Sequence, residues 1–461
     1  MRRFSIAAAL AAPLLLVSAV IERAQAQAGP GALDPRIEKL VASVSEERMK
    51  QLLTKLSSFR TRHTCSDPSA PDAVGAARQW IFEELTRTSP KLQVSFDTHP
   101  GLTARRCREP FELRNVMAVL PGRTPRRIYV SGHYDSVNLG ARGQEGLNTS
   151  AAGREGGAPT QASTPLPDPN LPAPGANDDG SGTVLSMELA RVFAESGIEF
   201  DATLVFMTVA GEEQGLVGAA AHAKMAKAQS IPIQAWFNND IVGNSHGGDG
   251  ITDGATIRVY SEGPEDSPSR SLAQFTRRVA AAYVPSHRVR LMARRDRMSR
   301  GGDHSALNTE GFAAIGFRES RENYSKQHNA NDTIDGVDFR YLAQNARVNA
   351  AAMATLALAP PPPAVTTQRG APTIDRRPSG YDAHLRWAAS PGAAGYRMFW
   401  RNAWAPDWEH ELSVGNVTEF VLPHANIDDW VFGVAAVDAA GHESTVSVYI
   451  AGPRSPESGG S

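Results

Sequence analysis

Short apolar segments alternate with helical patterns through most of the first 360 residues of this 461-residue chain, and this alternation leaves few possible folds. Six apolar runs have the length of strands: "NVMAVL", "RIYVSG", "ATLVFMTV", "IQAWFNNDIV", "TIRVYSE" and "FAAIGF". Helical patterns such as "GTVLSMELARVFAES" and "RYLAQNARVNAAAMATLAL" lie between or after them. The alternation predicts an α/β fold with a mostly parallel mixed sheet that helices cover on both faces.

Histidines and carboxylates follow the predicted strands at the points where the strands end. His133 and Asp135 occur in "SGHYDSV", Glu212 and Glu213 in "VAGEEQGL", Asp240 in "NNDIVG", and His328 and Asp332 in "QHNANDT". Asp178 stands in "GANDDGSG", directly before a helical pattern. Sites in such sheets form outside the carboxyl ends of the strands, so we expect these side chains to converge.

Five of these residues form a candidate ligand set: His133, Asp178, Glu213, Asp240 and His328. Imidazole nitrogen and carboxylate oxygen suit Zn²⁺ with open coordination positions. Five ligands are too many for one tetrahedral ion that keeps a water, but they suit two ions about 3.5–4 Å apart. We expect Asp178 to bridge the ions. His133 and Asp240 would complete one site, and Glu213 and His328 the other.

The remaining acidic residues receive supporting roles. Glu212 is the expected general base, because a carboxylate beside the ions can take a proton from the attacking water and return it to the leaving amine. Asp135 is expected to accept the second ring proton of His133, and Asp332 that of His328. The alternative for "GEE" is a solvated helix start, where acidic residues favour the helix dipole.

The motifs "SGHYDS", "GANDDGSG", "VAGEEQGLVGA", "NNDIVG" and "HNANDT" resemble those of the M28 family of zinc peptidases, the bacterial aminopeptidases in particular, over roughly residues 36 to 358. The resemblance implies a dinuclear zinc aminopeptidase with two Zn²⁺ per chain, acting on peptides. It also implies substrate-binding roles for Arg300 and Asp303 in "RGGDH", where family members often have Arg-Ser-Asp-His. A tyrosine often precedes the last ligand. Gln327 stands there in this chain, and Tyr324 is the expected substitute.

Three other functions are consistent with the same residues. A carboxypeptidase or a glutaminyl cyclase could use this scaffold, although "DDGSG" favours the two-metal peptidases. A binding protein that has lost catalysis is the third alternative. Such a protein would be expected to lack a ligand, and none of the five is missing.

The N-terminus predicts export from the cell. Residues 1–28 contain two arginines, an apolar run and "AQAQA", which is typical of a signal peptide. We therefore expect a periplasmic or secreted protein with no membrane contact after cleavage. An oxidising compartment favours a disulfide between the chain's two cysteines, Cys65 and Cys107. The net charge of −2 gives no basic surface for nucleic acid.

Composition divides the rest of the chain. We expect a catalytic domain over 29–359, with a flexible insertion rich in Gly, Ala, Pro and Ser at 139–174. A proline-rich linker follows at 360–373. Short alternating strands then predict a small β-sandwich over 374–453, which resembles a fibronectin type III domain. Its expected core is Trp387, Tyr396, Trp400 and Phe432. This domain is a candidate for contact with polysaccharide or protein surfaces.

Overall fold

The computed structural model describes residues 33–104, 107–140, 168–264 and 266–450. Within these residues the chain divides into two compact units, Pro35–Leu358 and a second unit that includes the chain from Ala359 onward. The predicted signal peptide lies outside the described residues, as does most of the 139–174 insertion. No helix in the described part of the chain is long and apolar enough to cross a bilayer.

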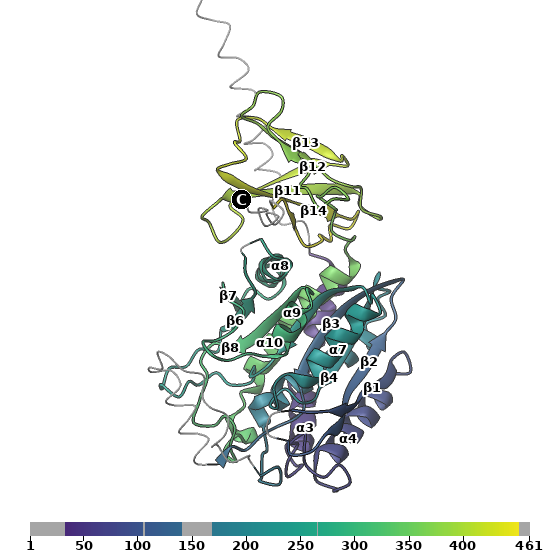
Figure 1. Cartoon of the computed structure of the whole chain (residues 1–461), viewed down its shortest axis with the longest axis vertical. Coiled ribbons are helices and arrows are strands. Elements are labelled where there is room, and N and C mark those ends of the chain that lie inside the picture. Colours follow the sequence, from purple (N-terminus) through teal and green to yellow (C-terminus); the bar gives the residue numbers. More distant parts are fainter. Residues whose placement is uncertain (1–32, 105–106, 141–167, 265, 451–461) are drawn as a thin grey trace, which may run out of the picture. The chain divides into compact units, whose positions relative to one another are not determined.

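An eight-stranded mixed sheet is the centre of the first unit (Figure 1), with the strand order β1-β2-β4-β3-β5-β8-β6-β7. The four central strands β4, β3, β5 and β8 run parallel. β1, β2 and β6 join the sheet in antiparallel pairs. The strands are β1 (Gln93–Leu102), β2 (Phe111–Leu120), β3 (Thr124–His133), β4 (Ala202–Val209), β5 (Ile233–Asn239), β6 (Thr256–Ser261), β7 (Arg288–Met292) and β8 (Ala314–Glu319).

Helices cover both faces of the sheet, as the alternation predicts. The larger layer consists of α2 (Pro35–Ala42), α3 (Glu46–Leu56), α4 (Val74–Thr88), α6 (Ser181–Glu195), α8 (Pro268–Tyr283) and α10 (Phe339–Leu358). The opposite face carries α7 (Val217–Ala228) and α9 (Asp303–Thr309). Two helical turns, η1 (Ala176–Gly180) and η2 (Ile334–Gly336), lie in the connections.

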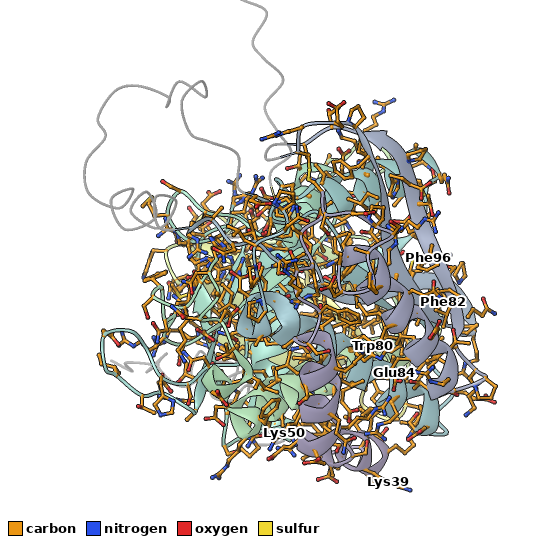
Figure 2. All side chains as sticks on the ribbon, turned by 90° about the horizontal axis from the view of Figure 1, so that it is seen from below. Lys39, Lys50, Trp80, Phe82, Glu84 and Phe96 are labelled. Atoms are coloured by element: carbon orange, nitrogen blue, oxygen red, sulfur yellow. A yellow bond between two sulfur atoms is a disulfide. The ribbon has the colours of Figure 1, made fainter. Side chains whose placement is uncertain are left out.

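Strand β4 shows why two helical layers form. All eight of its residues are buried. Leu204 and Phe206 pack in the large core under α6 and α10, whereas Val205 and Met207 pack in the smaller core under α7. Side chains alternate between the faces of a strand, so a continuous apolar run needs cover on both sides. At the sheet edge, Phe82 of α4 stacks on Phe96 of β1, with ring centroids 4.6 Å apart (Figure 2).

The described residues of the second unit from Ala359 onward form only β-strands and the loops between them. One sheet has the order β13-β10-β9 and the other β12-β11-β14-β15. Both contribute to one core, in which Trp387, Tyr396 and Phe432 are buried and Trp400 is partly buried. The strands are β9 (Ile374–Asp375), β10 (Ala383–Arg386), β11 (Gly395–Asn402), β12 (His410–Gly415), β13 (Glu419–Leu422), β14 (Trp430–Val437) and β15 (Ser447–Val448). Val365, in the expected linker, packs in this core as well, so the all-β unit extends into that segment.

Candidate metal centre

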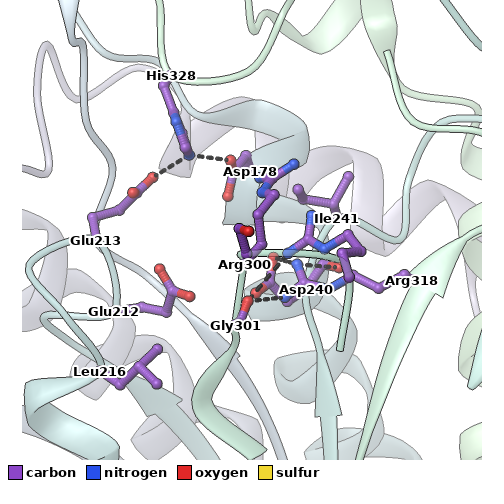
Figure 3. A pocket seen from close by; sticks show the side chains of 12 residues that line it. Asp178, Glu212, Glu213, Leu216, Asp240, Ile241, Arg300, Gly301, Arg318 and His328 are labelled. Carbon is purple, nitrogen blue, oxygen red and sulfur yellow. Dashed lines mark hydrogen bonds and ion pairs between the residues drawn. The ribbon is translucent and has the colours of Figure 1, made fainter. Parts of the chain in front are cut away.

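Five loops at one edge of the sheet supply the residues predicted to bind metal. His133 is the last residue of β3, and Asp178 lies in η1. Glu213 follows β4, Asp240 directly follows β5, and His328 lies in the loop after β8. The four strands involved are the parallel ones, so their carboxyl ends meet at the same edge. The structure therefore brings together all five residues that the sequence selected. Figure 3 shows four of them, Asp178, Glu213, Asp240 and His328.

Asp178 lies between the two histidines. Its Oδ1 is 3.3 Å from Nε2 of His133, and its Oδ2 is 3.1 Å from Nε2 of His328. Oε1 of Glu213 is 3.3 Å from the same nitrogen of His328. Oδ1 of Asp240 is 3.8 Å from Nε2 of His133. Each oxygen of Asp178 thus faces one histidine, which is the arrangement expected of a bridging carboxylate.

The cluster fits a dication. Nε2 of His133 and Oδ2 of Asp178 are buried without a hydrogen-bond partner among the described residues. A buried polar atom without a hydrogen-bond partner lowers the stability of the fold by about 1–3 kcal/mol, unless a bound ion or water satisfies it. Burial opposes charge on the His133 imidazole, yet the carboxylates of Asp135, Asp178 and Asp240 raise its pKa well above the usual value. The site therefore attracts positive charge, and its nitrogen and oxygen donors suit Zn²⁺.

Potential ligand atoms fall into two groups. Asp178, Glu213 and His328 form one group, and His133, Glu212 and Asp240 form the other. Glu212 thus lies beside His133 and not in the group of residues around His328. Burial, together with the charges of Asp240 and Asp178, raises the pKa of the Glu212 carboxyl to about 7, against the opposing effect of His133. A carboxyl with such a pKa can both accept and release a proton near neutral pH.

The sequence predicts that the carboxylates of Asp135 and Asp332 accept ring protons of His133 and His328. In the structure both carboxylates accept hydrogen bonds from main-chain N–H groups instead. Nδ1 of His133 is 3.0 Å from the main-chain carbonyl of Asp135, and the Asp135 carboxylate is farther away at 3.6 Å. That carboxylate instead accepts hydrogen bonds from the N–H groups of Glu212 and Glu213, both at 3.2 Å. The Asp332 carboxylate accepts from the N–H groups of Asn177 and Asp178. Both aspartates therefore orient loops that carry ligands, and a carbonyl fixes the His133 tautomer.

A cavity of about 410 Å³ opens over the cluster. Arg297, Arg300 and Arg318 line one side of it, with Leu216 and Ile241 as its apolar part. Arg300 is the most exposed of the three arginines, and its Nη1 is 3.2 Å from a carboxylate oxygen of Glu322. The structure places this predicted substrate-binding residue beside the candidate ligands.

The other two predicted substrate-binding residues lie elsewhere. Tyr324 is 55% exposed and packs under the guanidinium of Arg300, outside the set of described residues that line the cavity. Asp303 is fully buried at the start of α9. Burial, with Glu212 nearby, raises its pKa well above the usual value. A side chain without exposure cannot touch a substrate in this conformation, so Asp303 belongs behind the cavity wall.

Two further residues, Asp179 and Arg318, lie at the site although the sequence pattern assigned neither of them a role. Asp179 is fully buried and accepts hydrogen bonds from the N–H groups of His133, Gly182 and Ile241. Arg318 lies in β8 and pairs with the Asp240 carboxylate. That contact lowers the Asp240 pKa although burial opposes the shift. Arg318 lies near the carboxyl end of a parallel strand, so the strand-end rule that selected the ligands could also have selected it.

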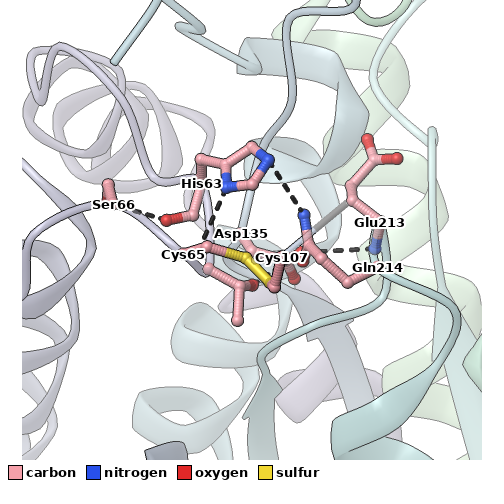
Figure 4. The surroundings of a disulfide bond; sticks show 8 residues. His63, Cys65, Ser66, Cys107, Asp135, Glu213 and Gln214 are labelled. Carbon is pink, nitrogen blue, oxygen red and sulfur yellow. Dashed lines mark hydrogen bonds between the residues drawn. A yellow bond between two sulfur atoms is a disulfide. The ribbon is translucent and has the colours of Figure 1, made fainter. Parts of the chain in front are cut away.

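The two cysteines form the expected disulfide, and it lies close to the ligand loops (Figure 4). Cys65 and Cys107 are paired, with their Cα atoms 5.7 Å apart. The neighbouring Thr64 hydroxyl donates to the Asp135 carboxylate at 3.3 Å. The cross-link therefore holds a segment that touches the residue orienting both glutamates.

Comparison with known proteins agrees with this geometry. The profile of peptidase family M28 matches residues 115–353, which is more than half of the chain and includes all five candidate ligands. The chain belongs to peptidase family M28.

Curated relatives of this M28 peptidase are named as zinc enzymes. A probable zinc metalloprotease of Leptosphaeria maculans is 35% identical over 440 residues, covering 88% of this chain and 94% of the relative. A probable zinc metalloprotease of Pyricularia oryzae is 35% identical over 479 residues, covering 95% and 86%. This chain is accordingly a zinc metallopeptidase of the M28 family.

Solved structures share the fold. The LapA aminopeptidase of Legionella pneumophila superposes with a TM-score of 0.51 at 19% identity, over 70% of this chain and 73% of that one. A glutaminyl cyclase of Porphyromonas gingivalis gives a TM-score of 0.50 at 16% identity, over 67% and 98%. One fold thus occurs in proteins with two different activities, so the activity has to be argued from the site.

Proposed function

We propose that this M28 peptidase is a dinuclear zinc aminopeptidase that acts outside the cytoplasm and removes N-terminal residues from peptides. The observation that supports two ions most directly is the position of Asp178, whose two carboxylate oxygens face different histidines at 3.3 and 3.1 Å. His133 and Asp240 would complete one site, and Glu213 and His328 the other. The N-terminal signal pattern supports export.

The chain's own residues supply the proton transfers. Zn²⁺ held by these residues would supply a Lewis acid that polarises a carbonyl group and lowers the pKa of a neighbouring water. Glu212 lies beside His133 and Asp240, where its carboxylate can take a proton from the attacking water. The same carboxyl then returns the proton to the leaving amine. The Asp135 carboxylate holds the main chain of Glu212, which fixes the base relative to the ligands.

The arginines of the cavity favour a carboxypeptidase as the second candidate. Arg297 and Arg318 are buried among carboxylates, whereas the side chain of Arg300 is 22% exposed beside the candidate ligands. A C-terminal carboxylate next to the scissile bond could pair with Arg300, since arginine binds carboxylates through two parallel hydrogen bonds. Removal of residues from either end of a peptide must therefore be distinguished by experiment.

A substrate panel tests the assignment. The purified protein is assayed for zinc content and then given aminoacyl amides, their N-acetylated forms and an unblocked peptide followed by mass spectrometry. We expect two zinc ions per chain, release from the amino end, and little turnover of the acetylated substrates because a free amine is required. Release from the carboxyl end would replace this assignment with the carboxypeptidase. Cyclisation of N-terminal glutamine without hydrolysis would indicate a glutaminyl cyclase.

A further inference from the structure

A fully buried guanidinium lies beneath the metal centre. Arg62, in the loop after α3, has no exposed surface. Nε donates to the carbonyl of Tyr134 at 2.6 Å, and Nη2 donates to that of Gly175 at 2.8 Å. Nη1 donates to the carbonyls of Pro174 at 2.5 Å and Leu56 at 3.3 Å. Four of the five N–H donors of the side chain are thus engaged by main-chain oxygens.

Three of these four carbonyls, all but that of Leu56 in α3, belong to two loops that carry candidate ligands. Tyr134 follows His133 directly, and Gly175 precedes Asp178 by three residues. Ser136 adds a second link between the same loops. Its hydroxyl donates to the carbonyl of Ala173 at 2.8 Å and accepts from the main-chain N–H of Arg62 at 3.1 Å. Arg62 and Ser136 therefore join the His133 loop to the Asp178 loop.

The charge of Arg62 is not balanced by a direct ion pair. Among the described residues, no carboxylate lies within ion-pair distance of its guanidinium, and its closest partners are neutral carbonyls. Its charge acts at longer range on Asp332, Asp135, Asp179 and Asp178. Burying a charge costs several kcal/mol of folding free energy. If Arg62 served packing alone, an apolar side chain of similar volume could therefore take its place with little loss of stability.

We propose that Arg62 is a positioning residue of the metal centre, whose planar guanidinium sets the spacing between His133 and the bridging Asp178. Lysine cannot replace it, because one ammonium group has three tetrahedral donors and cannot reach four carbonyls that surround a planar fork. The inference rests on the metal-binding half of the proposed function and is independent of which bond the enzyme cleaves.

Metal titration of the full-length protein tests the proposal. Wild-type protein and Arg62→Lys are stripped with a chelator and titrated with Co²⁺, and binding is followed by calorimetry and by visible absorption. Residues behind metal ligands typically change affinity 10–100-fold when replaced. We expect a loss of that size for at least one ion in Arg62→Lys, together with a changed absorption spectrum. No substrate is needed, so failure of the aminopeptidase assignment would leave this result interpretable.

Two further variants separate positioning from general stability. Phe275→Leu, in the core at α8, should lower the melting temperature but leave Co²⁺ affinity and absorption unchanged. Ser136→Ala removes only a hydroxyl and should weaken Co²⁺ binding by up to about tenfold, the equivalent of one hydrogen bond. A folded Arg62→Lys with wild-type affinity and spectrum overturns the proposal. If Arg62→Lys does not fold, unchanged Co²⁺ binding by Ser136→Ala overturns it.

Discussion

Glu212 and Glu213 are neighbours in the chain, yet their carboxylates face different partners. Oε1 of Glu213 lies 3.3 Å from Nε2 of His328, in the group with Asp178. Glu212 belongs to the group with His133. Both main-chain N–H groups donate to the one Asp135 carboxylate, which holds the pair in this divergent orientation. The two residues can therefore perform different tasks.

Replacement of each glutamate by glutamine should separate those tasks. Glu212→Gln keeps size and polarity but removes the base, so zinc content should stay unchanged while kcat falls by about 10²–10⁴-fold, as is typical for lost acid–base catalysis. Glu213→Gln places a neutral amide against a dication, so zinc content itself should fall and excess zinc should partly restore activity. Elemental analysis and turnover of both variants give the answer. Zinc loss in Glu212→Gln alone would mean that the roles are reversed.

The clustering of the five candidate ligands could be predicted from the sequence, because each lies near a strand or helix end that its neighbours in the sequence indicate. The contacts behind them could not. Whether the carbonyl or the carboxylate of Asp135 reaches His133 depends on the local path of the main chain, which residue order does not show. Arg62 joins segments more than 70 residues apart, and no spacing pattern marks such a link. Tyr324, the expected substitute for the family's tyrosine, is 55% exposed in the structure, and the sequence does not show this exposure.

Among the helices and strands, too, some could be predicted from the sequence and others could not. The parallel strands β3, β4, β5 and β8 were predictable, because strands covered on both faces read as continuous apolar runs. β1 was missed because it lies at the sheet edge, has no fully buried residue and contains Pro100 and Gly101. α7 was missed because its residues are mostly small and form no strong apolar stripe.

Edge strand β1 nevertheless supports the loop that carries both glutamates. Oδ2 of Asp97 accepts hydrogen bonds from Nδ1 of His222, Nε2 of His99 and Nδ2 of Asn115 at 2.9–3.0 Å. Oδ1 of Asn115 accepts from the N–H of Ala210, just before the two glutamates. Burial opposes ionisation of Asp97, but the hydrogen bonds from His222, His99 and Asn115 together outweigh it and lower the pKa of the carboxyl.

This lowered pKa predicts a pH-dependent stability difference for Asp97→Asn. A carboxyl with a lower pKa in the folded than in the unfolded state adds stability above its unfolded pKa of about 3.9, and this contribution is lost as the pH falls below it. The metal-free variant should therefore be less stable than wild type by about 1.5–3 kcal/mol at pH 7, the usual value for a charged hydrogen bond. Urea unfolding should show the same difference at pH 7 and pH 5, and a smaller one at pH 3.5 and smaller again at pH 3. A difference that stays equal down to pH 3 would contradict the ionised Asp97.

At the scale of the whole molecule, the candidate metal centre lies within one of the two compact units. All five candidate ligands lie within Pro35–Leu358, and they come from loops spread between residues 133 and 328. Only the folded chain gathers them, so metal bound there stabilises the folded state by RT ln(1 + [L]/Kd), about 2.7 kcal/mol at a hundredfold excess over Kd. The melting temperature should therefore rise with the logarithm of free zinc and fall with a chelator. A melting temperature independent of zinc would show that the ligands do not hold metal in the native protein.

The wide spread of the ligands has a consequence for the fate of the molecule. Metal bound there would connect loops that lie far apart in the sequence, so it would serve as a reversible cross-link as well as a reagent. Loss of about 2–3 kcal/mol of stability raises the unfolded fraction by roughly a hundredfold, and proteases remove unfolded chains. We therefore expect zinc shortage to lower the amount of the protein and not only its turnover, so that its abundance follows the zinc supply of its surroundings.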